Sequence, residues 1–236
     1  MTVCALSVFS TPSNLEGSAA AVPSKFPGTL KPGNFRFTLP SLMTAPSDRF
    51  DPEPAPGKGE RPRLKQGYVQ VYTGEGKGKT TAAMGLALRA LGAGLRVYLG
   101  QFIKAGAYSE IHALEKIGGE QLRCRQFGSG KWIRGQPGEE ETERARKGLE
   151  EVKEVLFSGD YDLVILDEAD MAVWFKLFPV EELTGLIDRK PAHVELVFTG
   201  RRADERLIER ADLVTEMREV KHYYQQGVLA RKGIES

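Results

Sequence analysis

Hydrophobic and polar positions follow two alternating periods along most of this 236-residue chain. After Gly67, short runs rich in β-branched and aromatic residues alternate with stretches in which apolar positions recur every three or four residues. This alternation is typical of a parallel sheet with crossover helices. We expect strands at residues 68–72, 96–102, 122–127, 162–167, 193–199 and 213–216, and helices near 79–91, 109–117, 139–157, 180–188 and 204–210. The pattern predicts one α/β domain whose mostly parallel central sheet carries helices on both faces.

The first 66 residues lack both periods and hold most of the prolines. A segment of this kind buries too little apolar surface to fold, so we predict a disordered leader over residues 1–66 and a folded domain over 67–236. Before Met43 the only acidic residue is Glu16, as in an organellar transit peptide, but the only arginine is Arg36. Translation that starts at Met43 is the other explanation, and both stay open.

Composition limits the classes of partner. The chain is 41% hydrophobic and 28% charged, as in a globular protein, and its formal net charge is +1. A near-neutral protein has no long-range attraction for nucleic acid or anionic lipid, so we expect neither partner. No apolar run approaches the roughly 20 residues that span a bilayer. The only cysteines are Cys4 and Cys124, which argues against a disulfide framework and favours a reducing, cytoplasmic location.

The strongest motif is the run TGEGKGKTT from Thr73 to Thr81, which joins an expected strand to an expected helix. Glycines let successive backbone N–H groups surround phosphate oxygens, and the helix start and Lys79 add positive charge. The hydroxyl of Thr80 is then placed for Mg2+. Thr73 stands where the usual motif has its first glycine, so the loop is a variant. The motif predicts a P-loop NTPase-like domain that binds a nucleoside triphosphate.

Charged residues within the loop differ in their expected roles. Lys77 adds a second cation beside Lys79, whereas Glu75 would repel phosphate if it pointed inward. We therefore expect the Glu75 side chain to point outward. Arg89 lies further along the same helix, either as a surface residue or as a nucleotide contact.

A second signal is the apolar strand that ends in Asp167 and Glu168. In parallel sheets such strand ends open onto the ligand crevice. Carboxylates there suit Mg2+, which prefers oxygen ligands and usually keeps several waters. Gln101 and Lys104 end another expected strand, and Arg201 follows a further one, but each alone has an ordinary structural explanation.

Five segments together resemble the P-loop type of corrinoid adenosyltransferase. The resemblance covers about residues 67–235, and the segments that carry it are 72–83, 101–104, 166–168, 199–201 and 220–222. It implies that ATP donates its adenosyl group to a reduced corrinoid and that triphosphate leaves. By resemblance, Lys79 and Glu168 serve catalysis, Gly74, Glu75, Gly76, Lys77, Gly78, Lys79, Thr80, Thr81, Arg89 and Arg201 bind the nucleotide, and Thr80, Glu168 and Asp167 hold Mg2+.

The chain departs from the best-known branch of that family on the corrinoid side. There, an aromatic pair follows a Gly-x-Gly turn and packs beside the corrin. Here the turn at residues 128–130 is followed by the single aromatic Trp132, our candidate for a corrin contact, with ordinary packing as the alternative. Asp170 and Met171 stand where asparagine or threonine followed by tyrosine is commoner.

The resemblance also implies partners. It implies a homodimer in which basic N-terminal residues, here 61–65, cover an active site, together with an electron-donating reductase. Two other functions remain open from the residues alone. One is a small-molecule kinase or ATPase on the same fold, and the other is a non-catalytic nucleotide- or corrinoid-binding protein.

Overall fold

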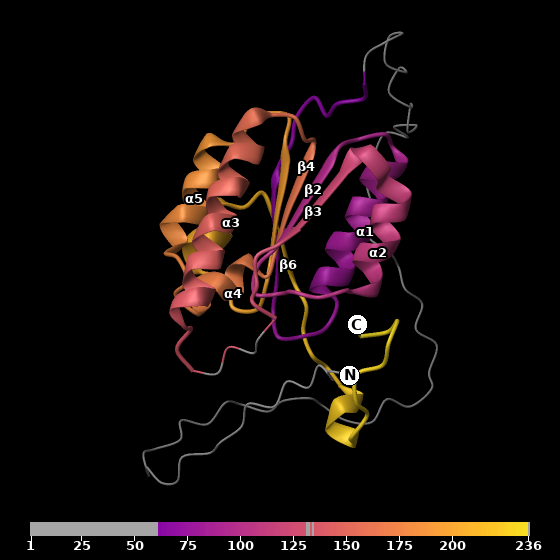
Figure 1. Ribbon diagram of the computed structural model, residues 1–236, viewed down its shortest axis with the longest axis vertical. Helices are drawn as coiled ribbons and strands as arrows, with labels where there is room; N and C mark the ends of the chain where they lie inside the picture. Colours follow the sequence, from indigo (N-terminus) through magenta and orange to yellow (C-terminus); the bar gives the residue numbers. More distant parts are fainter. Residues whose placement is uncertain (1–60, 131–132, 134, 236) are drawn as a thin grey trace, which may run out of the picture. The chain divides into compact units, whose positions relative to one another are not determined.

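The computed structural model describes residues 61–130, 133 and 135–235 (Figure 1). Its strands are β1 (Val69–Thr73), β2 (Val97–Gln101), β3 (Leu122–Gln126), β4 (Leu163–Asp167), β5 (Glu195–Thr199) and β6 (Leu213–Glu216). Its α-helices are α1 (Lys79–Gly92), α2 (Ser109–Gly118), α3 (Glu139–Ser158), α4 (Ala169–Trp174), α5 (Val180–Arg189) and α6 (Glu205–Arg210). Short 3-10 turns occupy Gly119–Gln121 and Tyr223–Gln226.

The six strands form one sheet in the order β3-β2-β4-β5-β1-β6, and every described pair is parallel. The register places Gln101 beside Asp167, and Tyr72 beside Thr199. The carboxyl ends of the strands therefore meet at one edge of the sheet. The predicted α/β class with a parallel central sheet is confirmed.

Helices cover both faces, and the side-chain alternation of β4 shows why its apolar run is continuous. Leu163 and Ile165 pack into the core beneath α1 and α2, whereas Val164 and Leu166 pack into the core beneath α3 and α5. Figure 1 shows these two helical layers on opposite sides of the sheet. A strand buried on both faces has to be apolar at every position.

All the expected elements are present with small shifts at their ends, and the structure adds one helix that was not expected, α4. This helix has six residues and starts directly after Glu168, whose left-handed backbone (φ 59°) turns the chain out of β4. A helix of this length is too short to display an apolar period. The sixth helix begins one residue later than expected, because Asp204 is its N-cap and accepts from the Arg206 N–H.

The basic segment at residues 61–65 lies at the edge of the sheet away from the phosphate loop. Arg61 pairs with Asp162 at 2.5 Å, and Arg63 donates to the carbonyl of Gly159. Asp162 immediately precedes β4, at its amino end. In their own chain these two arginines therefore lie away from the site they were expected to cover.

The segment after β6 braces the phosphate loop. The Met217 N–H donates to the Thr73 carbonyl at 2.8 Å, and the Gly76 N–H donates to the Met217 carbonyl at 2.7 Å. Further along, the carbonyl of Ile234 accepts from Lys77 at 3.2 Å. Figure 1 shows this C-terminal segment, in yellow, running past the end of β6 near the start of α1. No helix in the described part of the chain is long and apolar enough to span a membrane.

Candidate functional site

The phosphate loop joins β1 to α1. Gly78 takes a left-handed backbone (φ 118°) that side chains rarely adopt, and this turn directs the chain into the helix. The ammonium of Lys79 donates to the carbonyls of Gly74 at 2.6 Å and Gly76 at 2.7 Å, so it lies inside the loop. Burial lowers the pKa of Lys79, and the charge of Arg201 lowers it further. The loop therefore encloses the ammonium of Lys79.

Thr73 has a role that glycine could not supply. Its hydroxyl accepts from the Ala203 N–H at 3.1 Å, which ties the start of the loop to the segment after β5. Thr73 is buried, and its carbonyl also holds Met217. The Thr73 hydroxyl therefore fastens the segment after β5 to the loop, whereas the bond to Met217 uses the backbone and does not depend on the side chain.

Asp167 organises the carboxyl edge of the sheet. Its fully buried carboxylate accepts from Thr80 at 2.9 Å, Thr199 at 2.6 Å and Gln101 at 2.9 Å. These side chains come from α1, β5 and β2, so one carboxylate joins the phosphate loop helix to two neighbouring strand ends. Lys104 completes the shell at 2.7 Å.

Lys104 supplies the charge that keeps Asp167 ionised. Burial alone would raise the pKa of Asp167, but the ammonium of Lys104 and the surrounding hydrogen bonds hold it below its ordinary value. Lys104 also lies 3.0 Å from the Thr80 hydroxyl and 3.7 Å from a Glu168 oxygen. The pKa of Glu168 is raised, first by burial and then by the charge of Asp167. The two adjacent carboxyl groups thus differ in their readiness to ionise.

The oxygen atoms around Lys104 fit a divalent cation. The Lys104 ammonium is surrounded by oxygen atoms of Thr80, Asp167 and Glu168. Hydroxyl and carboxylate oxygens are the ligands that Mg2+ prefers. A set of oxygens that already surrounds one cation is suited to another. The chemistry of the donors therefore agrees with the metal-binding residues expected from the sequence.

Asp170 is a buried acid beside the site that the sequence marked only as a departure. Its side chain is 2% exposed, and neither carboxylate oxygen has a hydrogen-bond partner among the described residues. Burial, followed by the charge of Glu168, raises its pKa to about 8. The backbone of Gly200 approaches so closely that a Cβ atom there would lie 2.6 Å from the Cβ of Asp170.

Glu75 points away from the loop interior, as expected. Its side chain is 53% exposed and pairs with Arg202 at 3.0 Å and Arg201 at 3.4 Å. Arg202 also stacks on the indole of Trp174, with its guanidinium carbon 4.5 Å from the ring centre. The structure thus brings the expected nucleotide residues Glu75 and Arg201 together.

Two other expected site residues are exposed, and a third lies outside the described residues. Arg89 is exposed in the last turn of α1, at the end of the helix away from the phosphate loop. Thr81 is exposed in the first turn. Trp132, the candidate corrin contact, lies outside the described residues, so its role stays a prediction.

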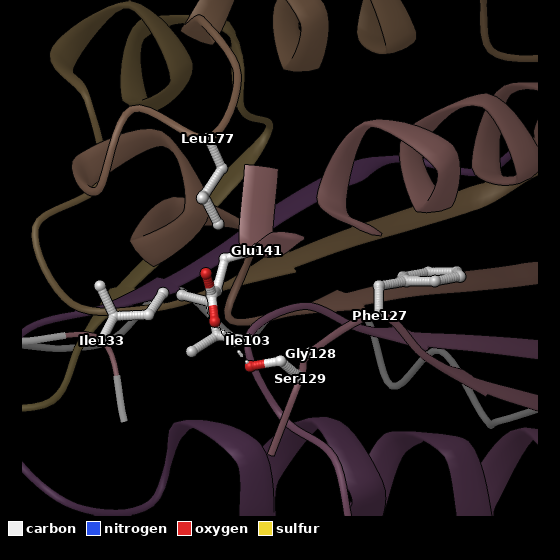
Figure 2. A pocket seen from close by; sticks show the side chains of 7 residues that line it. All are labelled: Ile103, Phe127, Gly128, Ser129, Ile133, Glu141 and Leu177. Atoms are coloured by element: carbon white, nitrogen blue, oxygen red, sulfur yellow. Dashed lines mark hydrogen bonds between the residues drawn. The ribbon is translucent and has the colours of Figure 1, made fainter. Parts of the chain in front are cut away.

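A small cavity is lined in part by Ser129 and Ile133, which flank Trp132 in the sequence. Ile103, Ile133 and Leu177 supply apolar walls, and Ser129 donates to Glu141 at 3.0 Å at its polar side (Figure 2). Its volume is about 10 Å³, room for about one water molecule. The cavity as it stands is therefore too small for a nucleobase or a corrin.

A parallel sheet whose first strand leads through a lysine-bearing glycine loop into a helix, with a strand-end carboxylate beside it, defines a P-loop nucleotide-binding protein. Within this class the chain belongs to the ATP:corrinoid adenosyltransferases, because residues 65–236 match the family model described as ATP:corrinoid adenosyltransferase BtuR/CobO/CobP. The resemblance carried by the five sequence segments is confirmed.

Known relatives agree with this family. The chain is 37% identical over 174 residues to a corrinoid adenosyltransferase of Escherichia coli (strain K12), which covers 72% of this chain and 86% of that protein. It is 36% identical over 190 residues to the corrinoid adenosyltransferase CobA of Salmonella typhimurium, covering 80% and 92%. A third relative, from Pseudomonas aeruginosa, is 34% identical over 173 residues, covering 73% and 85%. The chain is an enzyme of this family, and the reaction of the family is ATP-dependent adenosylation of a corrinoid.

Proposed function

We propose that the phosphate loop holds the triphosphate of ATP while its C5′ carbon faces the reduced cobalt of the corrinoid substrate. The observation that carries this assignment is the position of Lys79, whose ammonium is fixed inside the loop by the carbonyls of Gly74 and Gly76. Phosphate oxygens are stronger partners for an ammonium than carbonyls are. Lys79 is thus preorganised for the leaving triphosphate.

The reaction requires positioning and charge stabilisation, with no proton transfer. The electron pair of Co(I) forms the bond to C5′, the C5′–O5′ bond breaks, and triphosphate leaves with the electron pair of that bond. Lys79 and Lys77 offset the charge of the leaving group, and Arg201 approaches it from the end of β5. Preorganised charges of this kind act without reorganisation during the reaction.

The backbone of the loop contributes fewer free donors than the motif suggests. The Gly76 N–H donates to the Met217 carbonyl, so the other loop N–H groups and the first N–H groups of α1 are left to meet phosphate. Thr80, Asp167 and Glu168 would hold Mg2+, which supplies further neutralisation of the triphosphate. In this assignment Glu168 assists the metal directly, and Asp167 supports it through water and through its hydrogen bond from Thr80.

The reaction products test this function. The protein is incubated anaerobically with ATP, Mg2+ and a chemically reduced corrinoid, and triphosphate and a light-sensitive Co–C species are measured. We expect both in equal amounts. Release of ADP and phosphate instead, or a phosphorylated product, would identify a kinase or ATPase. Tight binding of ATP with no turnover would identify a binding protein.

The family resemblance implies how the protein assembles, and its cysteine content implies a reducing compartment. We propose a homodimer in the cytoplasm that receives a corrinoid reduced by a separate reductase, with the leader ending before Arg61, because Arg61 and Arg63 contact Asp162 and Gly159 of the folded domain. Light scattering of the purified protein tests the dimer. Mass analysis of the native N-terminus decides between Met1 and Met43 as the start. If Met43 is the start, deletion of residues 1–42 should leave activity unchanged, whereas a large loss would implicate the leader.

A further inference from the structure

Arg202 has a backbone conformation that is unusual for its side chain. Its φ is 58°, in the left-handed region, where non-glycine residues carry a steric cost. It lies two residues after Gly200, which directly follows β5. The φ of Gly200 is 155°, and its backbone approaches Asp170 closely. Strained residues of this kind persist where surrounding contacts fix them, and they gather at functional sites.

Two contacts fix the Arg202 side chain. Its guanidinium stacks on the indole of Trp174 at 4.5 Å, and its Nε atom donates to Glu75 at 3.0 Å. The Trp174 side chain is 51% exposed, so stacking explains its position better than burial does. The contact of Arg201 with the same carboxylate is longer, 3.4 Å, and the structure gives it no aromatic partner among the described residues.

The unequal contacts indicate that the two arginines have different roles. Glu75 is a carboxylate on the phosphate loop, so without a partner it would oppose the negative triphosphate. Arg202 is held on two sides and stays with Glu75. Arg201 is held weakly and is therefore free to leave Glu75 for a phosphate oxygen.

We propose that Arg202, stacked on Trp174, is a positioning residue that neutralises Glu75 and thereby leaves Arg201 and the phosphate loop available to ATP. This inference rests on the proposed binding of triphosphate by the loop. Its distinctive consequence is that the contribution of Arg202 to ATP binding depends on the charge of Glu75.

A double-mutant cycle measures that dependence. Arg202→Gly removes the side chain and suits the left-handed backbone, so the relief of backbone strain offsets the lost contacts and the variant should still fold. Affinity for ATP with Mg2+ and without corrinoid is measured by calorimetry in the parent, R202G, E75Q and the double variant. We expect R202G to weaken ATP binding about tenfold, the effect of one charge interaction. In the E75Q background, Arg202→Gly should weaken ATP binding by less than about threefold.

Matched variants separate this role from simple loss of charge. Arg206→Ala removes another carboxylate-paired arginine, on α6, and should leave ATP affinity unchanged. W174F should retain most of the affinity for ATP. W174A should bind ATP more weakly than the parent, but in the E75Q background the same change should leave ATP affinity unchanged. The R202G effect should also shrink at high salt, because the interaction is between partly exposed charges.

The outcomes distinguish this inference from the site assignment. If Lys79→Ala leaves ATP affinity unchanged, the assignment of the phosphate loop itself is wrong. The role of Arg202 is overturned by either of two results when Lys79→Ala abolishes ATP binding. One is that R202G lowers ATP affinity equally with Glu and with Gln at position 75, and the other is that R202G leaves ATP affinity unchanged.

Discussion

The ammonium of Lys104 lies 2.7 Å from the Oδ2 atom of Asp167, a carboxylate with no exposed surface. This pair joins the end of β4 to the segment after β2 and lies beside the hydroxyl of Thr80. It therefore links the stability of the sheet edge to the place expected to hold Mg2+.

Replacement of Lys104 by methionine tests this link. Loss of the ammonium leaves a buried carboxylate without its counter-charge, which costs about 3 kcal/mol of folding free energy. The melting temperature should fall by about 6–12 °C for a domain of this size. Because the oxygens would then lack a cation, Mg2+ should raise the melting temperature of K104M more than that of the parent. Equal Mg2+ responses would contradict a shared cation position.

Lys79→Ala should lower the rate of Co–C bond formation at saturating corrinoid by at least about tenfold, because it removes a preorganised charge from the leaving group. Lys147→Ala is a suitable control, since Lys147 pairs with Glu143 on the exposed face of α3. Near-parental rates for K79A would show that the loop holds the triphosphate in another way.

Asp170 should make stability depend on pH. Its pKa in the folded protein is about 8, above the ordinary value of 3.8, because it is buried and lies near Glu168. The unfolded chain thus loses this proton first as pH rises, so stability falls between about pH 4 and pH 8, by at most about 1.4 kcal/mol per pH unit. Asp170→Asn removes the effect. The melting temperature of D170N minus that of the parent should increase from pH 5 to pH 8, and a constant difference would contradict the assignment.

Gly76→Ala should disrupt the phosphate loop. An added Cβ would lie 2.6 Å from the carbonyl oxygen of Met217, which is backbone and cannot rotate away. We expect ATP affinity to fall by at least about tenfold, since the loop must move to relieve the clash. Gly85→Ala is the matched control, because a Cβ there meets nothing within 4 Å, and it should stabilise α1 by about 0.5–1 kcal/mol. Similar affinities for the two variants would argue against a rigid loop.

Much of this fold could be predicted because its signals are local. The apolar run of β4 and the glycine loop after β1 identify a parallel sheet and a triphosphate site from consecutive residues. The carboxyl-edge rule placed Asp167 near Thr80, and the structure gives 2.9 Å between them.

What the sequence left open depends on contacts between distant residues. Nothing local shows that Met217 closes the phosphate loop, that Lys104 lies among the oxygens of Thr80 and Asp167, or that Thr73 holds Ala203. The short helix α4 escaped detection because six residues carry no measurable period. Asp170 could have been found, since an acid in an otherwise apolar segment is a signal of its own.

The bond from Gly76 to Met217 has a consequence for the order of events during synthesis. The motif is complete when residue 81 leaves the ribosome, but its shape depends on a backbone partner made much later. A nascent chain that ends before β6 should therefore carry the motif and still fail to retain ATP. Nucleotide capture would then report that the last strand has docked, which makes the ligand an indicator of finished folding for this enzyme.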